Sequence, residues 1–110
     1  MSLDTLRPTD ITLCMKIRRV AHKGLRRFVE KNDPSGLPAA AVEKIRNIVS
    51  YLQEIENIEE LRHVRSWRAH RLTGDRRATW SLSVTRNWRI TLRLDGAGIE
   101  IVELDYEDYH

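Results

Sequence analysis

Cysteine is almost absent from this sequence, since Cys14 is the only one among the 110 residues. A single thiol excludes an internal disulfide framework and suits a reducing compartment. The N-terminus also lacks the apolar segment of a secretory signal, and no apolar run approaches the length that spans a bilayer. We therefore expect a cytoplasmic protein that has no membrane partner.

The histidines lack the short spacing that metal ligands usually show. They occupy positions 22, 63, 70 and 110, and no two of them form a ligand motif. Gly74 and Asp75 are more typical of a turn than of a phosphate-binding loop, which needs more glycine and a following helix N-terminus. We expect no bound metal and no small-molecule cofactor, and we expect His22 and His63 to be structural or surface residues.

Acidic residues are nearly missing from one segment, although the net charge of the whole chain is only +3. Residues 62–93 hold nine arginines and one acid, whereas residues 95–110 hold six acids and no lysine or arginine. The planar arginine side chain suits phosphate groups and stacks on bases. This segment favours a polyanionic partner, most simply a nucleic acid. The alternative is a charged face that only keeps the protein soluble.

Hydrophobic periodicity predicts two helices in the first half of the chain. Apolar residues recur at helical spacing in residues 22–31, and a break follows at residues 32–36. Pro38 suits the first position of a second helix, whose apolar stripe continues to about residues 56–58.

Alternating patterns predict the strands. In chain order the expected strands are residues 15–21, 68–72, 80–85, 88–94 and 99–104, with a hairpin turn at residues 95–98. The order β-α-α-β-β-β-β predicts an α+β fold, with two N-terminal helices packed on one face of a small antiparallel sheet. Residues 15–110 are expected to form this single domain, and residues 1–14 a polar N-terminal extension.

The same alternation divides the strand residues between two faces of the sheet. If Trp88 and Ile90 point toward the helices, then Arg89 and Arg93 point away from them, beside the serines of the preceding strand. The face without helices would then be polar and positive, and would hold single-stranded nucleic acid through phosphate contacts and base stacking. Trp80 shares the apolar phase with Trp88, and both are expected in the core.

The chain closes with the acidic stretch LDYEDYH. The last strand is expected to end near residues 104–106, which places Asp108, Tyr109 and His110 just beyond the edge of the sheet. An acidic tail that docks on the arginine-rich face would hold His110 in place. The alternative is a solvated tail without a role.

These residues include the groups that RNA cleavage without a metal requires. A base removes the proton of a ribose 2′-OH, a cation stabilises the phosphate, and an acid protonates the departing 5′-oxygen. His70 and His110 can divide the acid and base roles, with Arg89 as the cation. Asp108 would orient a histidine or act as a base, and Tyr109 would stack on a nucleobase.

Several separated blocks of the sequence resemble one family. HRLTGDRRATWSLSVTRNWRITLRL (His70 to Leu94) followed by ELDYEDYH (Glu103 to His110) is similar to HigB-type toxins, the host-inhibition-of-growth branch of the RelE superfamily. HKGLRRFVEK (His22 to Lys31) and SGLPAAAVEKI (Ser35 to Ile45) also resemble this family. The resemblance covers about residues 15–110.

The resemblance implies a RelE-like fold and a bacterial type II toxin that enters the ribosomal A site and cuts translated mRNA. It also implies a helix-turn-helix antitoxin of the HigA type as partner. His70, Asp108, Tyr109 and His110 match active-site positions of the family, and Arg89 matches an arginine that related toxins place near the scissile phosphate. The further positions expected to bind RNA are Arg68, Arg71, Thr73, Arg76, Arg77, Arg86 and Arg93.

One position departs from the family pattern. The lysine of the family motif Leu-Lys-Gly-Asp is Thr73 in this chain. Because loss of one preorganised charge donor costs on the order of 10²–10³ in rate, we expect a slow enzyme, or one that relies on Arg71, Arg76 or Arg77 instead.

Two other functions remain open on the sequence alone. The same fold carries gyrase poisons of the ParE type, which need no RNA-cleaving residues. A toxin-derived protein that binds RNA without cutting it is the other alternative, and its binding would depend strongly on salt.

Overall fold

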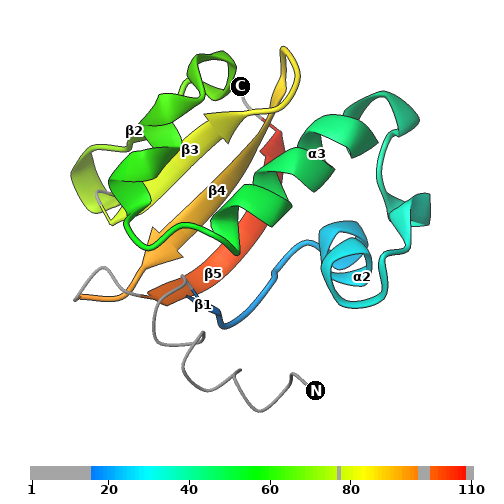
Figure 1. The fold of residues 1–110 in the computed structure, drawn as a ribbon, viewed down its shortest axis with the longest axis horizontal. Coiled ribbons are helices and arrows are strands. Elements are labelled where there is room, and N and C mark those ends of the chain that lie inside the picture. Colours follow the sequence, from blue (N-terminus) through cyan, green and yellow to red (C-terminus); the bar gives the residue numbers. More distant parts are fainter. Residues whose placement is uncertain (1–15, 77, 97–99, 109–110) are drawn as a thin grey trace.

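Residues 16–76, 78–96 and 100–108 are described by a computed structural model of the chain. α3 (Ala39–Leu52) lies across one face of a five-stranded sheet, and α2 (Lys23–Lys31) packs beside it (Figure 1). The predicted α+β class is confirmed.

Capping interactions define the ends of α2. The Nδ1 atom of His22 accepts a hydrogen bond from the Leu25 N–H at 3.1 Å, so the helix begins one residue later than predicted. Asn32 has a left-handed backbone, with φ at 57°, and its N–H donates to the Phe28 carbonyl at 2.9 Å. Leu25 and Phe28 are buried between these caps, which anchors the helix to the core.

α3 ends earlier than its apolar stripe predicts. Pro38 has an extended backbone and precedes the helix rather than taking its first position, as predicted, and the helix stops at Leu52 rather than near residues 56–58. Asn57 and Glu60 then form a capping box, which begins a separate 3₁₀ segment at Ile58–His63. Apolar spacing alone does not distinguish one long helix from a helix followed by a 3₁₀ turn.

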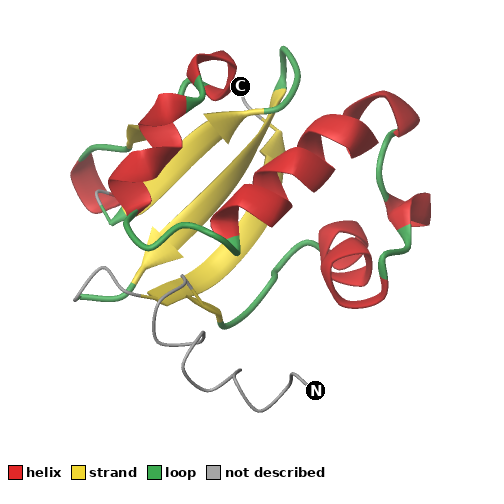
Figure 2. Cartoon of the chain, in the orientation of Figure 1, coloured by secondary structure: helices red, strands yellow, loops and turns green. Residues whose placement is uncertain are grey.

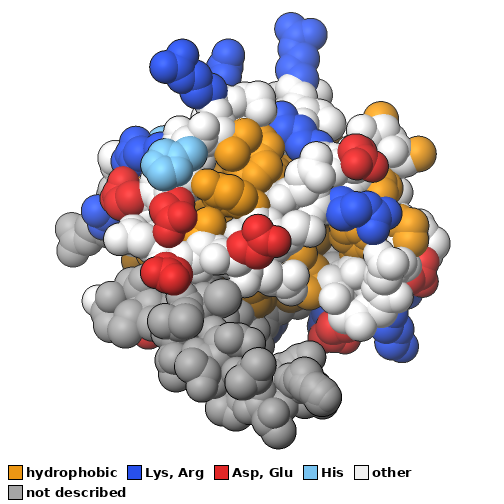
Figure 3. Space-filling view, viewed as in Figure 1, with side chains coloured by type: hydrophobic (Ala, Val, Ile, Leu, Met, Phe, Trp, Pro, Cys, Tyr) orange, Lys and Arg blue, Asp and Glu red, His pale blue; other side chains and the backbone are white. Residues whose placement is uncertain are grey.

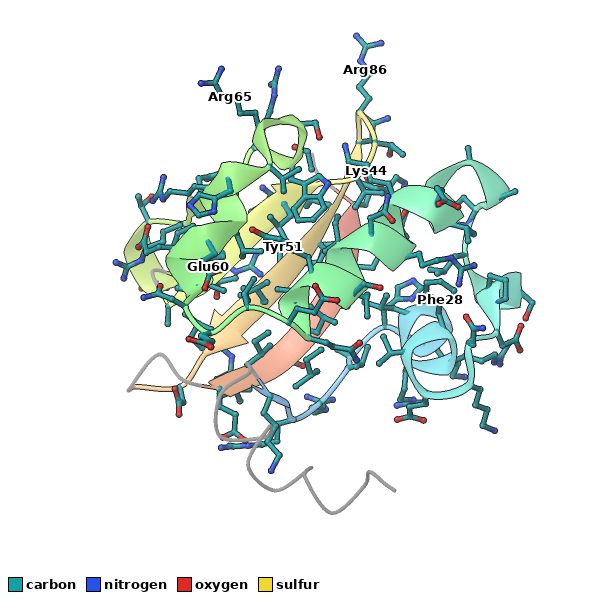
Figure 4. All side chains as sticks on the ribbon, in the orientation of Figure 1. Phe28, Lys44, Tyr51, Glu60, Arg65 and Arg86 are labelled. Atoms are coloured by element: carbon teal, nitrogen blue, oxygen red, sulfur yellow. The ribbon has the colours of Figure 1, made fainter. Side chains whose placement is uncertain are left out.

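The 3₁₀ segment is tied back to α3. The Tyr51 hydroxyl donates to the Glu60 carbonyl at 2.9 Å, and Figure 4 shows these two residues facing each other. A second short segment, Arg65–Trp67, leads into the sheet. Within the described ranges, no helix is both long and apolar enough to cross a membrane.

The sheet has the strand order β1-β5-β4-β3-β2. The strands are β1 (Lys16–Ile17), β2 (His70–Arg71), β3 (Thr79–Ser83), β4 (Trp88–Leu94) and β5 (Glu100–Asp108). Neighbouring strands are antiparallel except that β1 runs parallel to β5, so the expected antiparallel sheet is in fact mixed. The helices separate β1 from the rest of the sheet along the chain, and such a long connection permits parallel pairing.

Several strand lengths also differ from prediction. β1, expected over residues 15–21, is Lys16–Ile17 in the described chain, and β3, expected over residues 80–85, is Thr79–Ser83. β2 is limited to His70 and Arg71 rather than residues 68–72, and it cannot begin at Arg68, whose backbone is left-handed with φ at 49°. β5 continues to Asp108 rather than ending near residues 104–106, and Asp108 pairs with Trp88 on β4. Asp108 therefore belongs to the sheet and is not part of a free tail.

The core lies between α3 and the sheet, with red helices in front of yellow strands in Figure 2. Ile45 and Ile48 of α3 and Leu82 of β3 have no exposed surface, and Trp80 is buried as predicted. Trp88 is only half-buried and stacks on the Tyr106 ring at 4.7 Å between centroids. Figure 3 shows apolar side chains reaching the surface near the middle of the helical side.

Candidate functional site

Strand alternation gives the face of the sheet opposite the helices a polar lining. Ser81 of β3 pairs with Thr91 of β4, which pairs with Asp105 of β5. Ser83, Arg89 and Glu107 form the next row. The predicted division of β4 between an apolar and a charged face is therefore confirmed.

A hollow of about 250 Å³ lies around one part of this polar face, and we call it the basic hollow. It is lined by Arg68, His70, Ser81, Ser83, Thr85, Arg86, Trp88 and Arg89. The lining contains three arginines and no acidic residue, so its electrostatic potential favours an anion. Figure 4 shows Arg86 projecting from the turn between β3 and β4.

The orientation of His70 follows from its place at the start of β2. Its backbone pairs with Ser81, and its Nδ1 atom lies 3.0 Å from the Arg68 carbonyl oxygen. Because a carbonyl oxygen only accepts hydrogen bonds, Nδ1 carries the proton in this contact. The Nε2 atom is the other ring nitrogen, and it takes no part in this contact.

Arg89 lies beside His70 in the same lining. Its Nη1 atom donates to the Ser81 hydroxyl at 3.3 Å, and its side chain is half-buried. Ser81 is also the residue that pairs with His70, so one serine lies next to both candidate catalytic groups. The structure thus brings a histidine and an arginine together without an acid among the lining residues.

A second hollow, of about 230 Å³, lies on the same face of the sheet, and we call it the acidic hollow. It is lined by Asp75, Arg76, Thr79, Thr91, Arg93, Glu103, Asp105 and Glu107. Arg76 donates to both Glu107 carboxylate oxygens, at 2.8 and 3.3 Å, and Arg93 lies 3.5 Å from Glu103. Four carboxylates outnumber two arginines here, so this hollow does not favour phosphate.

Two carboxyl groups of the acidic hollow shift in opposite directions. Burial raises the pKa of Asp105, and the neighbouring charges of Glu107 and Glu103 add to the rise against a hydrogen bond from the Tyr106 N–H. Burial would also raise the pKa of Glu107. Hydrogen bonds from Arg76 and Thr91 and the positive charges of Arg76 and Arg89 outweigh that effect, so this pKa is lowered.

The predicted site residues are thus distributed over several places. His70, Arg89, Arg68 and Arg86 gather in the basic hollow, whereas Arg76 and Arg93 lie in the acidic one. Three other predicted residues are exposed: Arg71 on β2, Thr73 after it, and Asp108 at the end of β5. The last three, Arg77, Tyr109 and His110, lie outside the described residues.

Sequence reasoning missed the acidic hollow. Its signal is the alternation of Glu103, Asp105 and Glu107 with Leu104 and Tyr106, which continues the β5 pattern beyond the predicted end of the strand. In the described part of the chain, no three histidine, cysteine or acidic side chains gather as metal ligands.

A family model described as the RelE-like toxin of the type II toxin-antitoxin system HigB matches residues 18–110. The chain belongs to the HigB toxin family. Endoribonuclease HigB from Proteus vulgaris is 38% identical over 94 residues, which cover 86% of this chain and 99% of that relative. The resemblance seen in the sequence is confirmed, and membership of this HigB family supports an antitoxin as partner.

Solved structures of related toxins resemble this HigB-family chain at low sequence identity. The YoeB/ParE toxin from Agrobacterium tumefaciens has a TM-score of 0.50 at 20% identity, over 87% of this chain and 99% of that one. The toxin-antitoxin complex RelBE2 from Mycobacterium tuberculosis has a TM-score of 0.40 at 17% identity, over 86% and 99%. The first likeness supports a RelE-like fold and concerns the fold alone.

Proposed function

We propose that this toxin is an endoribonuclease that cuts translated mRNA in the ribosomal A site. The observation that carries the proposal is the basic hollow, whose lining contains His70, Arg89 and two further arginines and no acidic residue. The activity named for the relative from Proteus vulgaris, an endoribonuclease, supports the same reaction.

The proposed chemistry is acid-base catalysis without a metal. The ribose 2′-oxygen attacks the phosphorus atom and loses its proton to a base, while the bond to the 5′-oxygen breaks and an acid protonates that oxygen. The products are a 2′,3′-cyclic phosphate and a 5′-hydroxyl. Nε2 of His70 takes one of the two proton-transfer roles, because Nδ1 is held at the Arg68 carbonyl.

Arg89 stabilises the additional negative charge on the phosphate in this scheme. Its contact with Ser81 limits its rotation before RNA binds, which is the preorganisation that electrostatic catalysis requires. His110 takes the second proton-transfer role, Asp108 orients a histidine or acts as a base, and Tyr109 stacks on a nucleobase. The other arginines of the basic hollow contact neighbouring phosphates.

The proposed partners follow from the same reaction. The substrate is mRNA on the 70S ribosome in the bacterial cytoplasm, and the inhibitor is a helix-turn-helix antitoxin of the HigA type. The arginines that line the basic hollow suit the phosphates of one segment of single-stranded RNA.

Primer extension on translated mRNA tests the proposal when wild type is compared with His70→Ala. We expect ribosome-dependent cuts inside codons that disappear in this variant. His63→Ala is the matched control, because His63 is an exposed histidine outside the basic hollow, and its cuts should persist. Absence of cuts by wild type, together with inhibition in a DNA-supercoiling assay, would instead favour a ParE-type gyrase poison.

A further inference from the structure

We propose that the ion pair between Arg76 and Glu107 is a clamp that positions the loop after β2 over the sheet. In this role Arg76 is a positioning residue and not an RNA contact, contrary to its assignment from the sequence. The inference rests on the proposed nuclease function, because the clamp is expected to set the geometry of that active site.

The pair connects parts of the fold that are distant both in sequence and in the sheet. Arg76 ends the 3₁₀ turn Gly74–Arg76, which joins β2 to β3, whereas Glu107 lies on β5. β4 separates β3 from β5, so the contact spans about 10 Å across the sheet. The loop between β2 and β3 must therefore lie over the polar face of the sheet for Arg76 to reach Glu107.

The contact has the geometry of a strong ion pair. The two terminal guanidinium nitrogens of Arg76, Nη1 and Nη2, donate to Glu107, and the Thr91 hydroxyl from the intervening strand donates to Oε2 of the same carboxylate. A bidentate pair fixes the relative orientation of its two planes as well as their distance. The Glu107 side chain is 27% exposed and the Arg76 side chain 47%, so the carboxylate is the more sheltered partner of the pair.

A second arginine–glutamate pair on the same face provides a comparison. Arg93 and Glu103 lie opposite each other on adjacent strands, and their contact is 3.5 Å through one nitrogen. That pair joins two strands that the sheet already holds together. The Arg76–Glu107 pair, in contrast, adds a restraint on the loop that the backbone pairing of the sheet does not supply.

The restraint matters because β2 is short. His70 and Arg71 are its only residues, and the loop that follows carries Thr73. Glu107 immediately precedes Asp108, at the end of β5. The clamp therefore joins the loop that follows His70 to β5, whose last residue is the proposed catalytic Asp108.

The clamp and an RNA-binding role for Arg76 predict opposite effects of Glu107→Gln. Loss of this carboxylate removes a negative charge next to Arg89 and leaves Arg76 unpaired, so RNA binds more tightly by simple electrostatics. The loop loses its restraint at the same time. Because small misplacement of a catalytic group costs on the order of 10²-fold in rate, cleavage should fall while affinity for RNA rises.

The experiment compares Glu107→Gln, Arg76→Gln and the double variant. Single-turnover cleavage of ribosome-bound mRNA gives the rate, and polarisation of a fluorescent single-stranded RNA gives the affinity. We expect each single variant to lower the rate about 10–100-fold, with no further loss in the double variant, because both substitutions remove the same contact. Glu103→Gln is the control: it removes the same charge from β5, together with the contacts of Glu103 to Arg19 and Arg93, neither of which lies in the loop after β2, and it should keep the wild-type rate.

Arg76→Lys separates charge from geometry. Lysine keeps the positive charge but lacks the bidentate fork, so the clamp predicts a lower rate, whereas an RNA contact predicts a rate close to wild type. The proposal would be overturned by a wild-type rate in Glu107→Gln, by rate losses that multiply in the double variant, or by weakened RNA binding in Arg76→Gln with an unchanged single-turnover rate at saturation.

Hydrogen exchange tests the clamp independently of the nuclease proposal. The Leu72 and Arg76 amides donate to Thr79 and Thr73 carbonyls, and we expect both to exchange faster in Glu107→Gln but not in Glu103→Gln. If wild type cuts no RNA, the nuclease proposal fails, but hydrogen exchange still tests whether the Arg76–Glu107 pair restrains the loop. Unchanged exchange of both amides in Glu107→Gln would contradict the clamp.

Discussion

Thr73 lies exposed in the loop after β2, at the position where the resemblance to HigB-type toxins implies a lysine. Two described arginines lie near Thr73 in the sequence. Arg71 is exposed on β2, whereas Arg76 forms an ion pair with Glu107. Because its charge is already paired with Glu107, Arg76 does not substitute for a lysine at position 73.

We expect Thr73→Lys to increase the rate of mRNA cleavage. One additional cation near the phosphate contributes up to about 10²-fold in rate where it stabilises the transition state. Single-turnover cleavage on ribosomes is the measurement. Ser50→Lys is the control, since it adds the same charge to an exposed position of α3. Equal rates for the two variants would mean that the charge at position 73 acts only through general attraction of RNA.

The two shifted carboxyl groups give a prediction for stability. Folding lowers the pKa of Glu107 from its ordinary value of 4.5, so Glu107 stabilises the protein above that pH and loses this effect as the pH falls through the folded-state pKa. Folding raises the pKa of Asp105, so its ionisation costs stability as the pH rises from its ordinary value of 3.8 through the raised pKa.

At pH 7 we therefore expect Glu107→Gln to lower the free energy of unfolding by about 1–2 kcal/mol and Asp105→Asn to raise it slightly. Urea denaturation at pH 7 and pH 3 measures both, and both differences from wild type should shrink at the lower pH. A loss in Glu107→Gln that is equally large at pH 3 would show that packing, rather than charge, is responsible.

At the scale of elements, α2 is held by an unusually close backbone contact. A Cβ atom on Gly24 would lie 2.2 Å from the Gly36 carbonyl oxygen, and one on Gly36 would lie 2.7 Å from the Gly24 Cα. The start of α2 and the turn before α3 therefore pack together only because both positions are glycine.

We expect Gly24→Ala to destabilise the protein by about 1–3 kcal/mol, the usual cost of overpacking. The midpoint of urea denaturation measures the change. Gly96→Ala is the matched control, because nothing lies within 4 Å of a Cβ atom there, and it should have little effect. Similar midpoints for both variants would contradict the close packing of α2.

Helices and strands whose apolar residues recur regularly could be predicted from the sequence. Boundaries that depend on local capping interactions could not. The apolar stripe of α3 and the alternation of β4 gave their positions closely, including the face that carries Arg89. The chain after α3 continues into a separate 3₁₀ segment that starts with the Asn57–Glu60 capping box, and an apolar stripe does not reveal such a division. The extension of β5 places Asp108 in the sheet, and the acids before it alternate as strand residues do.

The candidate site was predictable only in part, for a related reason. Alternation brings Arg89 to the polar face, but the position of His70 depends on the pairing of a two-residue strand. The separation of Arg76 and Arg93 from the basic hollow depends on their ion pairs with β5. Such pairing between distant segments is not encoded in the local sequence pattern.

At the scale of the whole molecule, charge is divided between the two hollows of the polar face. The basic hollow holds three arginines among its lining residues, whereas carboxylates outnumber arginines in the acidic one. Single-stranded RNA is therefore expected to follow the basic hollow and to avoid the acidic hollow. Binding that depends on phosphate contacts should weaken as the salt concentration rises.

We expect Arg86→Ala to weaken RNA binding and to lower the slope of log K against log salt by about 0.7, the value for one phosphate contact of a single strand. Fluorescence polarisation across a salt series measures the slope. Arg26→Ala removes the same charge from the exposed side of α2 and is the control. An equal change of slope in both variants would indicate general attraction rather than a defined RNA path.

The central claim is that this member of the HigB family cuts translated mRNA with a histidine-based site. Mapping the 5′ ends of a translated mRNA, with and without ribosomes, tests this claim most directly when wild type is compared with His110→Ala. We predict cuts inside codons that require ribosomes and vanish in His110→Ala. Cuts that persist unchanged in His110→Ala would contradict the assigned catalytic residues, and the absence of any cut by wild type would contradict the nuclease itself.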